Sequence, residues 1–490
     1  MKEVRKLAGQ TVIYGLGTIV PRFLNYAILT PFYTREFSKA EYGVITELYA
    51  WMVLLQIVLT YGMETGFFRF SQDKENYDKT YSTALISLIS TSIVFLVLVF
   101  VFISPVSELM NYSENHDYIR MFASILAVDA ICAIPFARLR SEKRALLFST
   151  VKILNVVITV LAVIFLIKVA PSIYENSHGW FRKVYNPEYK VGYAFAANLF
   201  GSVFTLLVLI PYSFRLKFNF SMDIWKRMIN YSFPLLVAGL SGSINDAIDK
   251  VMLRRLVGGE NGLATVGEYG AGYKLAVLMA LFIQMFRYAA EPFFFERAKH
   301  EDARETYREV MKYFIIVMLV VFMAINLYIP AIQYILGKSF RDSVIVVPMV
   351  SFAYLLYGIY VNHSVWYKIN DLTKFGILIT LVGAIITVSI NLIFVPVNGY
   401  IASAWAHLAS YLAMLIVSFW LARKHYPVDY ELHKVAPYFI IAVLAVVTDI
   451  YFHPENDFAR IALNTSYMII FIAYSHYKDK ALNLFIIRRR

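Results

Sequence analysis

The chain has 490 residues, of which 59% are hydrophobic and only 16% are charged, and its formal net charge is +12. A soluble protein carries about 25% charged residues, so this composition excludes an ordinary soluble enzyme and indicates a protein that crosses a membrane many times. The one cysteine, Cys132, excludes an internal disulfide and a cysteine metal cluster, and the nine histidines form no HxxxH or HExxH pair.

Apolar segments of a length that can cross a bilayer as helices follow one another from the N-terminus to the C-terminus. They cover residues 8–33, 42–65, 80–104, 119–137, 146–167, 191–212, 229–252, 265–291, 313–335, 344–367, 375–395, 399–421, 435–452 and 458–477. The sequence therefore predicts an all-α polytopic membrane protein with about 14 transmembrane helices.

Lysine and arginine are distributed unevenly between the two sides of these segments. With the N-terminus in the cytoplasm, the inner segments hold 29 of these residues and the outer loops hold 10. This asymmetry follows the positive-inside rule and predicts that both termini are cytoplasmic. We therefore interpret the basic excess as a topology signal and expect no nucleic-acid partner. The loop "RLRSEKR" (Arg138–Arg144) and the tail "IIRRR" are expected to lie against anionic membrane lipid.

The two halves of the chain repeat each other. Glu41-Tyr42-Gly43 recurs as Glu268-Tyr269-Gly270, 227 residues later, and the basic residues of the loop after the fourth segment recur after the tenth at an offset of 230. A repeat of six segments, an even number, predicts two parallel lobes related by an axis along the membrane normal. The expected organisation is a lobe at 1–212, a second lobe at 213–423, and two extra helices with a basic tail at 424–490.

Polar side chains follow single helical faces in three of the segments. In the seventh, one face carries Gly239, Gly242, Ser243, Asp246 and Lys250, with Asp249 at its edge, and the opposite face carries Leu240, Ile244, Ile248 and Val251. The first segment aligns Gly15, Thr18, Arg22 and Asn25. The eighth aligns Lys274, Gln284, Arg287, Tyr288 and Glu291.

A charge at the bilayer centre costs about 2.5–3.5 kcal/mol, so these faces are expected to line a helix-bundle interior or a wet cavity. The candidate substrate-binding residues are Arg22, Asn25, Lys250, Lys274, Gln284, Arg287 and Tyr288. A purely structural alternative is that Asp246 and Lys250 neutralise each other as an i, i+4 pair. Asp129 and Lys152 are a second candidate pair within the first lobe, and Asp449 is expected to be solvated near an outer helix end.

Four stretches carry a resemblance to a known family, namely "FSKAEYGVITEL", "DKVMLRRLVG", "VGEYGAGYKLA" and "SINLIFVPVNGYIASAWAHLAS". With the fourteen segments and the repeat, the chain resembles a polysaccharide-biosynthesis flippase of the Wzx-type (O-antigen and repeat-unit) branch, in the MATE/MOP superfamily that also contains multidrug exporters. The resemblance implies two MATE-like lobes, alternating access, and transfer of an undecaprenyl-diphosphate-linked oligosaccharide across the bacterial inner membrane for cell-surface polysaccharide synthesis. It also implies a cationic cavity, which Arg22, Lys250, Lys274 and Arg287 are placed to supply. We expect a monomer, with a glycan polymerase or glycosyltransferases as candidate partners.

Two other functions stay open at this point. A cation-coupled multidrug or metabolite exporter on the same fold would favour an acidic, aromatic cavity, which the basic candidates argue against. A membrane-embedded glycan polymerase, ligase or acyltransferase would need a large outer loop or a paired catalytic site, so we expect no enzyme and no cofactor. Asp246, Asp249, Glu291 and Asp129 are candidates for coupling to H+ or Na+, or for holding the basic groups in place.

Overall fold

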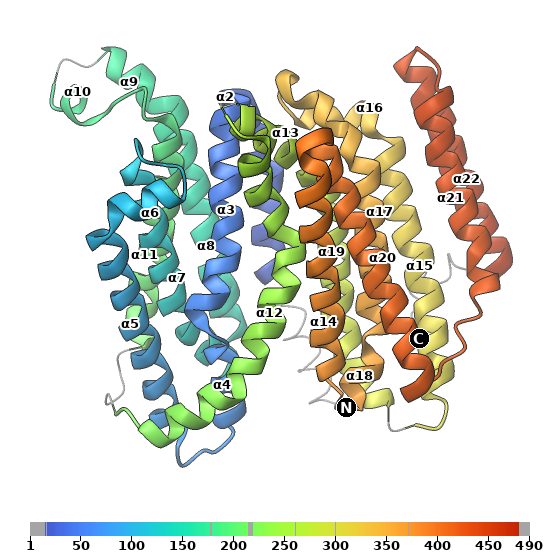
Figure 1. Ribbon diagram of the computed structural model, residues 1–490, viewed down its shortest axis with the longest axis horizontal. Coiled ribbons are helices and arrows are strands. Elements are labelled where there is room, and N and C mark those ends of the chain that lie inside the picture. The colour runs from blue at the N-terminus through green and yellow to red at the C-terminus, as the bar shows by residue number, and fades with distance from the viewer. Residues whose placement is uncertain are drawn as a thin grey trace. The chain divides into compact units, whose positions relative to one another are not determined.

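Helices make up all the regular structure in the described part of the chain, which comprises residues 15, 17–176, 179–213, 219–259, 261–298, 300–370 and 372–479 of a computed structural model (Figure 1). Within these residues, 11 helices are long and apolar enough to cross a membrane, or 12 if one bent pair counts as a single span. The protein is therefore a multi-pass membrane protein. The predicted count of 14 is compatible with this, since residues 8–14 and 16 of the predicted first span lie outside the described residues. The predicted seventh span forms one helix that carries many charges.

The chain divides into two compact units, described here one at a time. Unit 1 comprises Met1–Glu36 and Val44–Val251, and unit 2 comprises Phe37–Gly43 and Met252–Arg490. Two long helices, α3 (Lys39–Thr60) and α12 (Met222–Val257), each contribute residues to both units. The division into lobes at 1–212 and 213–423 is based on the sequence repeat, and it stays a prediction.

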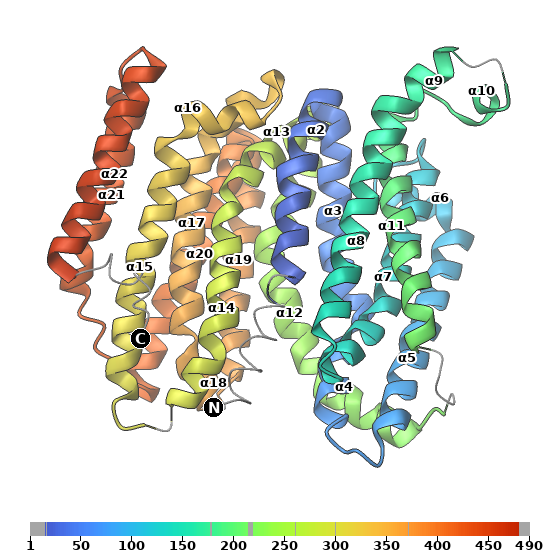
Figure 2. The ribbon, with the colours of Figure 1, turned by 180° about the vertical axis from the view of Figure 1, so that it is seen from behind.

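Unit 1 is a bundle around α5, α7, α8 and α11, which pack on one another (Figures 1 and 2). Residues 17–24 are helical and continue into η1 (Asn25–Leu29) and α2 (Thr30–Glu36). The other elements of this unit are α4 (Met63–Phe70), α5 (Tyr77–Val101), α6 (Ile103–Leu109), α7 (His116–Ser141), α8 (Ala145–Ile164), η2 (Phe165–Val169), α9 (Ala170–Asn176), α10 (Phe181–Val184) and α11 (Lys190–Ser213). Both η1 and η2 are π-helical turns.

The start of α12 is held against the core of unit 1. Met228 packs with Phe67 and Tyr81 in one buried cluster, and the Trp225 Nε1–H donates to the Ser87 hydroxyl at 2.8 Å. Burial of such side chains stabilises the unit by about 1.5–3 kcal/mol each. This packing fixes the first part of α12 to the bundle from which its charged second half extends.

Unit 2 is a bundle in which α17 and α19 both pack on α20, and α15 packs on α17. Its elements are α13 (Asn261–Ala276), α14 (Leu278–Arg297), α15 (Ala303–Leu327), α16 (Ile329–Ile332), η3 (Gln333–Ile335), η4 (Lys338–Val346), α17 (Val347–His363), α18 (Val365–Ile369), α19 (Lys374–Asn398), α20 (Tyr400–His425), α21 (Leu432–Phe452) and α22 (Asp457–Asp479). Gly399, at a φ of +56°, makes the turn between α19 and α20, a backbone conformation that favours glycine.

Aromatic side chains fill the centre of unit 2. The hydroxyls of Tyr273 on α13 and Tyr354 on α17 lie 2.5 Å apart, and both rings contact the ring of His407 on α20. All three side chains are buried. The buried hydroxyls find partners inside the cluster, as buried tyrosines usually do, so we interpret this cluster as a packing core.

The first turn of α3, which belongs to unit 2, packs closely on α13 at two glycines. A capping box starts the helix, because the Ser38 backbone N–H donates to the Glu41 carboxylate and the Glu41 N–H donates to the Ser38 hydroxyl. A Cβ at Gly43 would overlap the Leu263 carbonyl oxygen, and one at Gly267 would overlap the Lys39 carbonyl oxygen. The two backbones can approach this closely only because both residues are glycine.

The two C-terminal helices, α21 and α22, pack on α15 and on each other. Asp449 on α21 is buried and forms a two-pronged ion pair with Arg460 on α22, with N–O distances of 2.8 and 2.7 Å. Asn464 donates both to Asp449 and to the Leu327 carbonyl oxygen of α15, each at 2.7 Å. The expectation of a solvated Asp449 was therefore wrong: its carboxylate is an interhelical link.

The basic loop Arg138–Arg144 is largely paired with acids. Arg138 and Arg144 both bind Glu142, at 2.6 and 3.0 Å, and Arg140 pairs with Glu64 on α4. These arginines are therefore engaged within the protein, and Lys143 is the exposed member of the loop without an acid partner among the described residues. The tail "IIRRR", which was also expected to bind anionic lipid, lies outside the described residues.

Candidate functional site

The candidate residues of the first span belong to unit 1, in which their helix and η1 pack on α8. A Cβ at Gly17 would overlap Ser149, so the helix packs on α8 at this point. Arg22 comes five residues later, about 140° around the helix, and is exposed. Asn25 is also exposed and begins the π-turn η1. Such turns are frequent at functional sites. This one precedes Pro31, which cannot donate the backbone N–H that would bond the Ala27 carbonyl within the turn.

The second half of α12 has the two faces that its sequence predicts. Leu240, Ile244 and Ile248 pack with Ala50 and Leu54 of α3, so the predicted apolar face is the packed one. The polar face follows on the other side of the helix. This places Asp246 and Lys250 together on one side of unit 1, as expected from the helical period.

Lys250 is buried and ion-paired. Its ammonium donates to the Asp249 carboxylate at 2.9 Å and to the Asp246 carbonyl oxygen at 2.8 Å. Asp249 is fully buried and also accepts the Lys250 backbone N–H at 2.8 Å. The expected structural alternative was a pair between Asp246 and Lys250, four residues apart. The carboxylate that the structure brings onto Lys250 belongs instead to its neighbour Asp249.

Asp129 on α7 and Lys152 on α8, the second candidate pair, are each half-buried in unit 1 and interact electrostatically. They make no direct ion pair. The Asp129 carboxylate accepts a hydrogen bond from Ser202 on α11, and the Lys152 ammonium lies 4.0 Å from the centre of the Phe136 ring. Arg22 acts on the same lysine electrostatically, which links the first span to this polar interior.

The predicted eighth span is broken in two. Helices α13 and α14 meet at Val277 with a bend of 44°. Lys274 lies before the bend and Gln284 and Arg287 lie after it, so they do not follow one straight helical face. The expectation of a single aligned stripe was therefore wrong. Within α14 the alignment holds, and the Gln284 amide donates to the Tyr288 hydroxyl at 3.4 Å.

Glu291 and Arg287 differ in their surroundings within unit 2. The Glu291 carboxylate accepts from Lys368 of α18 at 2.7 Å. Arg287, half-buried on α14, has no ion-pair partner among the residues that the structure describes. Its guanidinium therefore keeps donors available for an anionic ligand. Guanidinium groups bind phosphates in bidentate fashion.

Two acidic residues that the sequence reasoning did not select have specific partners. Glu47 on α3 is buried and accepts from the Tyr112 hydroxyl at 2.7 Å. Glu268 on α13 pairs with Lys39 at 3.0 Å, next to the glycine crossing. Glu47 is the one charged residue in the apolar run "GVITELYAW", which could have marked it as a buried acid that needs a partner. The recurrence of Glu-Tyr-Gly pointed to the region of Glu268 but not to its partner.

The chemistry available in these residues is binding of anions and hydrogen-bonding groups. Unit 1 offers the exposed side chains of Arg22 and Asn25, and unit 2 offers Lys274, Gln284, Arg287 and Tyr288, each half-buried. Within the described residues, no group of three or more His, Cys, Asp or Glu side chains could hold a metal ion.

Comparison with known proteins gives a family and a fold. The family described as "Polysaccharide biosynthesis protein" matches residues 7–298. The solved structure of the lipid II flippase MurJ, in an inward closed conformation, has a TM-score of 0.73 and 13% identity, and the similarity covers 95% of this chain and 99% of that one. An inward-facing multidrug resistance MATE family transporter of the MOP superfamily has a TM-score of 0.65 and 17% identity, covering 84% of this chain and 97% of that one. No curated protein sequence matches the chain.

Proposed function

Because the chain belongs to the polysaccharide biosynthesis protein family, we propose that it is a flippase for a lipid-linked oligosaccharide. The family match is the observation that carries this proposal, and the flippase fold of the MurJ structure supports it. The expected cargo is an undecaprenyl-diphosphate-linked oligosaccharide, moved from the cytoplasmic to the periplasmic leaflet of a bacterial inner membrane by alternating access. Both termini are then cytoplasmic, and the protein acts as a monomer beside glycosyltransferases or a polymerase.

A diphosphate and its sugars cannot cross hydrocarbon unaided, because their charges and hydroxyls would lose water without replacement. We assign binding of the diphosphate to Arg22, Lys250, Lys274 and Arg287, and binding of sugar hydroxyls to Asn25, Gln284 and Tyr288. Charge-assisted hydrogen bonds to phosphate are about twice as strong as neutral ones. The exposure of Arg22 and the lack of an acid partner for Arg287 among the described residues favour these two as the main contacts.

The acidic candidates divide into two groups. Asp249 and Glu291 each bind a lysine ammonium, which favours a charge-pairing role for both. We assign coupling to H+ or Na+ to Asp129 or Asp246. A transport assay with an imposed gradient of either cation tests this assignment. If neither gradient changes the rate of transport, the two residues have a structural role and do not couple transport to a cation.

The function can be tested in liposomes that contain the purified protein and a fluorescent polyprenyl-diphosphate oligosaccharide. Movement of the label between leaflets is read from its protection against a membrane-impermeant quencher. We expect fast movement with the wild-type protein and slow movement with an Arg22→Ala/Arg287→Ala variant. An Arg120→Ala variant is the matched control, since Arg120 is an exposed arginine that pairs with Asp117 three residues away.

Three outcomes separate the candidate functions in this assay. Movement of the intact glycolipid supports the flippase. Efflux of an organic cation such as ethidium, with no movement of the glycolipid, would instead support a multidrug exporter. The structural similarity to a MATE transporter is compatible with that function. A covalently altered glycan, detected by mass spectrometry of the recovered lipid, would indicate an enzyme.

A further inference from the structure

The segment after the fifth predicted span forms a small cap at one end of unit 1. Helix α8 runs through η2 into α9 without a break, from Ala145 to Asn176, over 32 residues. At 1.5 Å per residue this is about 48 Å, well beyond the hydrocarbon thickness of about 30 Å. About 20 residues suffice to cross, which brings the helix out of the hydrocarbon near η2. Figures 1 and 2 show α9 leaning away from α8 beyond that point.

A column of stacked rings holds α10 at the level of the membrane boundary. Tyr193, in the first turn of α11, stacks on Tyr185 with ring centres 4.8 Å apart and planes 3° apart. Phe181 of α10 stacks on Tyr185 at 5.5 Å and 9°. Because Tyr193 belongs to a membrane-spanning helix that starts at Lys190, the column fixes α10 beside the end of that span.

A hydrogen bond secures the same column to the π-turn. The Tyr185 hydroxyl donates to the Leu166 carbonyl oxygen of η2 at 2.7 Å. Burial raises the pKa of Tyr185 to about 12, so the hydroxyl keeps its proton and stays a donor. A π-turn disturbs the usual ladder of helix hydrogen bonds, and this hydroxyl gives one of its carbonyls a partner. The cap is therefore firmly attached to the bundle.

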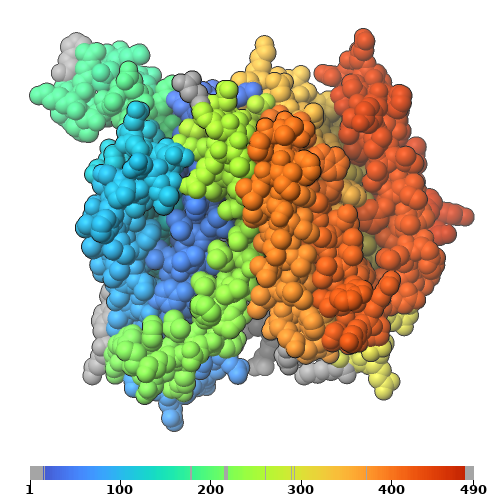
Figure 3. All heavy atoms as spheres, in the orientation of Figure 1, coloured from blue at the N-terminus to red at the C-terminus, as the bar shows by residue number. Residues whose placement is uncertain are grey.

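The outer side of the cap is apolar although it lies between two spans. Trp180 and Val184, four residues apart, are 73% and 72% exposed. Phe181 of α10 and Tyr185, which follows the helix, belong to the ring column, whereas Trp180 and Val184 are exposed. Exposed apolar side chains in a connecting segment indicate a surface that another apolar phase covers. Figure 3 shows this segment standing out at the upper left of the view.

Basic side chains flank these apolar ones. Arg182 and Lys183 are both exposed, and the Arg182 guanidinium lies 5.3 Å from the centre of the Tyr174 ring of α9. An apolar stripe next to lysine and arginine is the composition of segments that lie in the interface of an anionic membrane. Tryptophan and tyrosine are also enriched at that level.

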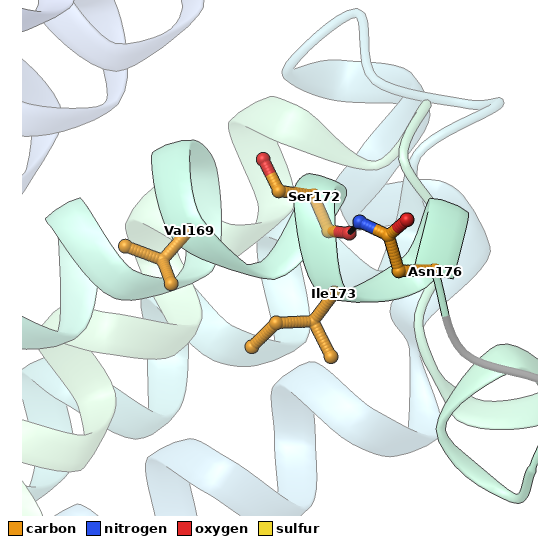
Figure 4. A pocket seen from close by; sticks show the side chains of 4 residues that line it. All are labelled: Val169, Ser172, Ile173 and Asn176. Carbon is orange, nitrogen blue, oxygen red and sulfur yellow. Dashed lines mark hydrogen bonds between the residues drawn. The ribbon is translucent and has the colours of Figure 1, made fainter.

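The face of α9 is hollowed beside this surface. A shallow, open pocket of about 350 Å³ is lined by Val169, Ser172, Ile173 and Asn176, and the Asn176 amide donates to the Ser172 carbonyl oxygen at 2.8 Å (Figure 4). Two of the four lining residues, Val169 and Ile173, are apolar, and the other two are polar. This mixture matches the region of a lipid where the acyl chains meet the glycerol and the phosphate.

We propose that the cap formed by α9 and α10 is a docking surface for anionic phospholipid. Trp180 and Val184 enter the acyl boundary of the leaflet, and Arg182 and Lys183 bind lipid phosphates. The aliphatic side chains of Val184 and Ile173 favour lipid over a soluble oligosaccharide, which would need polar partners around Trp180. The proposal goes beyond the transport function and does not depend on it.

Depth measurements on single-cysteine variants test the apolar part of the surface. Cys132 is the only native cysteine and is buried, so a Cys132→Ala background is suitable. Nitroxide labels at Trp180→Cys and Val184→Cys are compared with Val97→Cys, exposed in the C-terminal part of α5, and with Glu114→Cys in the α6–α7 loop. We expect the labels at 180 and 184 to be reached by oxygen more than by a water-soluble nickel complex. Nickel access equal to that at position 114, at both sites, would overturn the proposal.

The charge part is tested by changing the lipid. Adding phosphatidylglycerol to neutral liposomes is expected to lower nickel access at position 180. In an Arg182→Gln/Lys183→Gln variant this effect should fall at least twofold, while Lys143→Gln, another exposed lysine, should leave it unchanged. An equal phosphatidylglycerol effect in both variants would overturn the proposal. Protection of position 180 by free oligosaccharide, but not by lipid, would replace it with a carbohydrate surface.

Discussion

The ammonium of Lys250 lies 2.9 Å from the carboxylate of Asp249, the adjacent residue on α12. Asp249 is fully buried, and this contact places a positive charge directly on its carboxylate. A buried pair of this kind costs desolvation energy when it forms, and breaking it by removing one partner is strongly destabilising. The pair therefore has a structural role whether or not Lys250 also contacts a substrate.

Replacing Lys250 alone should destabilise the protein. Lys250→Met removes the ammonium that binds the buried Asp249 carboxylate, a change that costs about 3–5 kcal/mol in comparable pairs. The Asp249→Asn/Lys250→Met variant removes both charges and should regain most of this. Stability can be followed as the Tm at which a thiol-reactive dye gains access to Cys132, the only cysteine, which is buried.

The same two variants separate structure from function. If the double variant regains the wild-type Tm but transports the glycolipid slowly, Lys250 also contacts the substrate, as we propose. A Lys250→Met variant as stable as wild type would show that the pair with Asp249 is not needed to neutralise the buried carboxylate.

The sequence predicts well which residues share one face of a helix. It predicts poorly which side chains from different helices pair with each other. The prediction of an apolar face on α12 is confirmed. It needed only the helical period of 3.6 residues per turn, which places Leu240 and Ile244 on one side of the helix. The partner of Glu291 is Lys368, 77 residues away in sequence, and no local pattern indicates it. The i, i+4 rule selects pairs within one helix and does not reach such contacts.

The break in the predicted eighth span was equally beyond local reasoning. The bend at Val277 falls in "KLAVLMA", which contains neither proline nor glycine, so the sequence carries no breaker signal. The π-turn Asn25–Leu29 has a signal of this kind, because Pro31 follows it and cannot donate a backbone N–H to the Ala27 carbonyl. The all-α membrane fold and its many spans follow directly from hydropathy, since every span must satisfy its own backbone hydrogen bonds.

Arg287 is expected to matter for transport more than for folding. It has no ion-pair partner among the described residues, so Arg287→Ala leaves no described acid unpaired. Loss of a hydrogen bond to a charged group costs about 1.5–3 kcal/mol, which predicts a fall in transport of roughly 10- to 100-fold. Arg287→Lys should retain part of the activity, because it keeps the charge but loses the bidentate geometry.

The measurement for Arg287 is the rate of glycolipid movement in liposomes, with Arg120→Ala as the control and the Tm of each variant recorded. Wild-type transport by Arg287→Ala would remove this residue from the binding site. A large drop in Tm would instead assign it a structural role.

The glycine crossing between Gly43 and Gly267 should tolerate no side chain. An alanine at either position places a Cβ on a backbone carbonyl oxygen, and such overpacking typically costs about 1–3 kcal/mol. Gly242→Ala is a matched control, since Gly242 is also helical and its Cβ would meet nothing within 4 Å. Alanine in a helix is favoured over glycine by up to about 1 kcal/mol, so the control should raise the Tm slightly while the other two lower it. Equal Tm changes in all three variants would contradict the crossing.

The ion pair of Asp449 and Arg460 should hold the C-terminal helices together and to α15. Arg460→Ala leaves a buried carboxylate whose remaining partner is Asn464, and we expect a loss of about 3–5 kcal/mol in the local stability of this pair of helices. Hydrogen exchange measured by mass spectrometry should rise in α21 and α22 and stay unchanged in α5. Arg460→Lys should give an intermediate result, because one ammonium cannot reproduce the two-pronged contact. Since α21 and α22 lie outside the repeated segments, transport per folded molecule should stay close to wild type. Loss of transport without faster exchange in these helices would instead place Arg460 in the transport pathway.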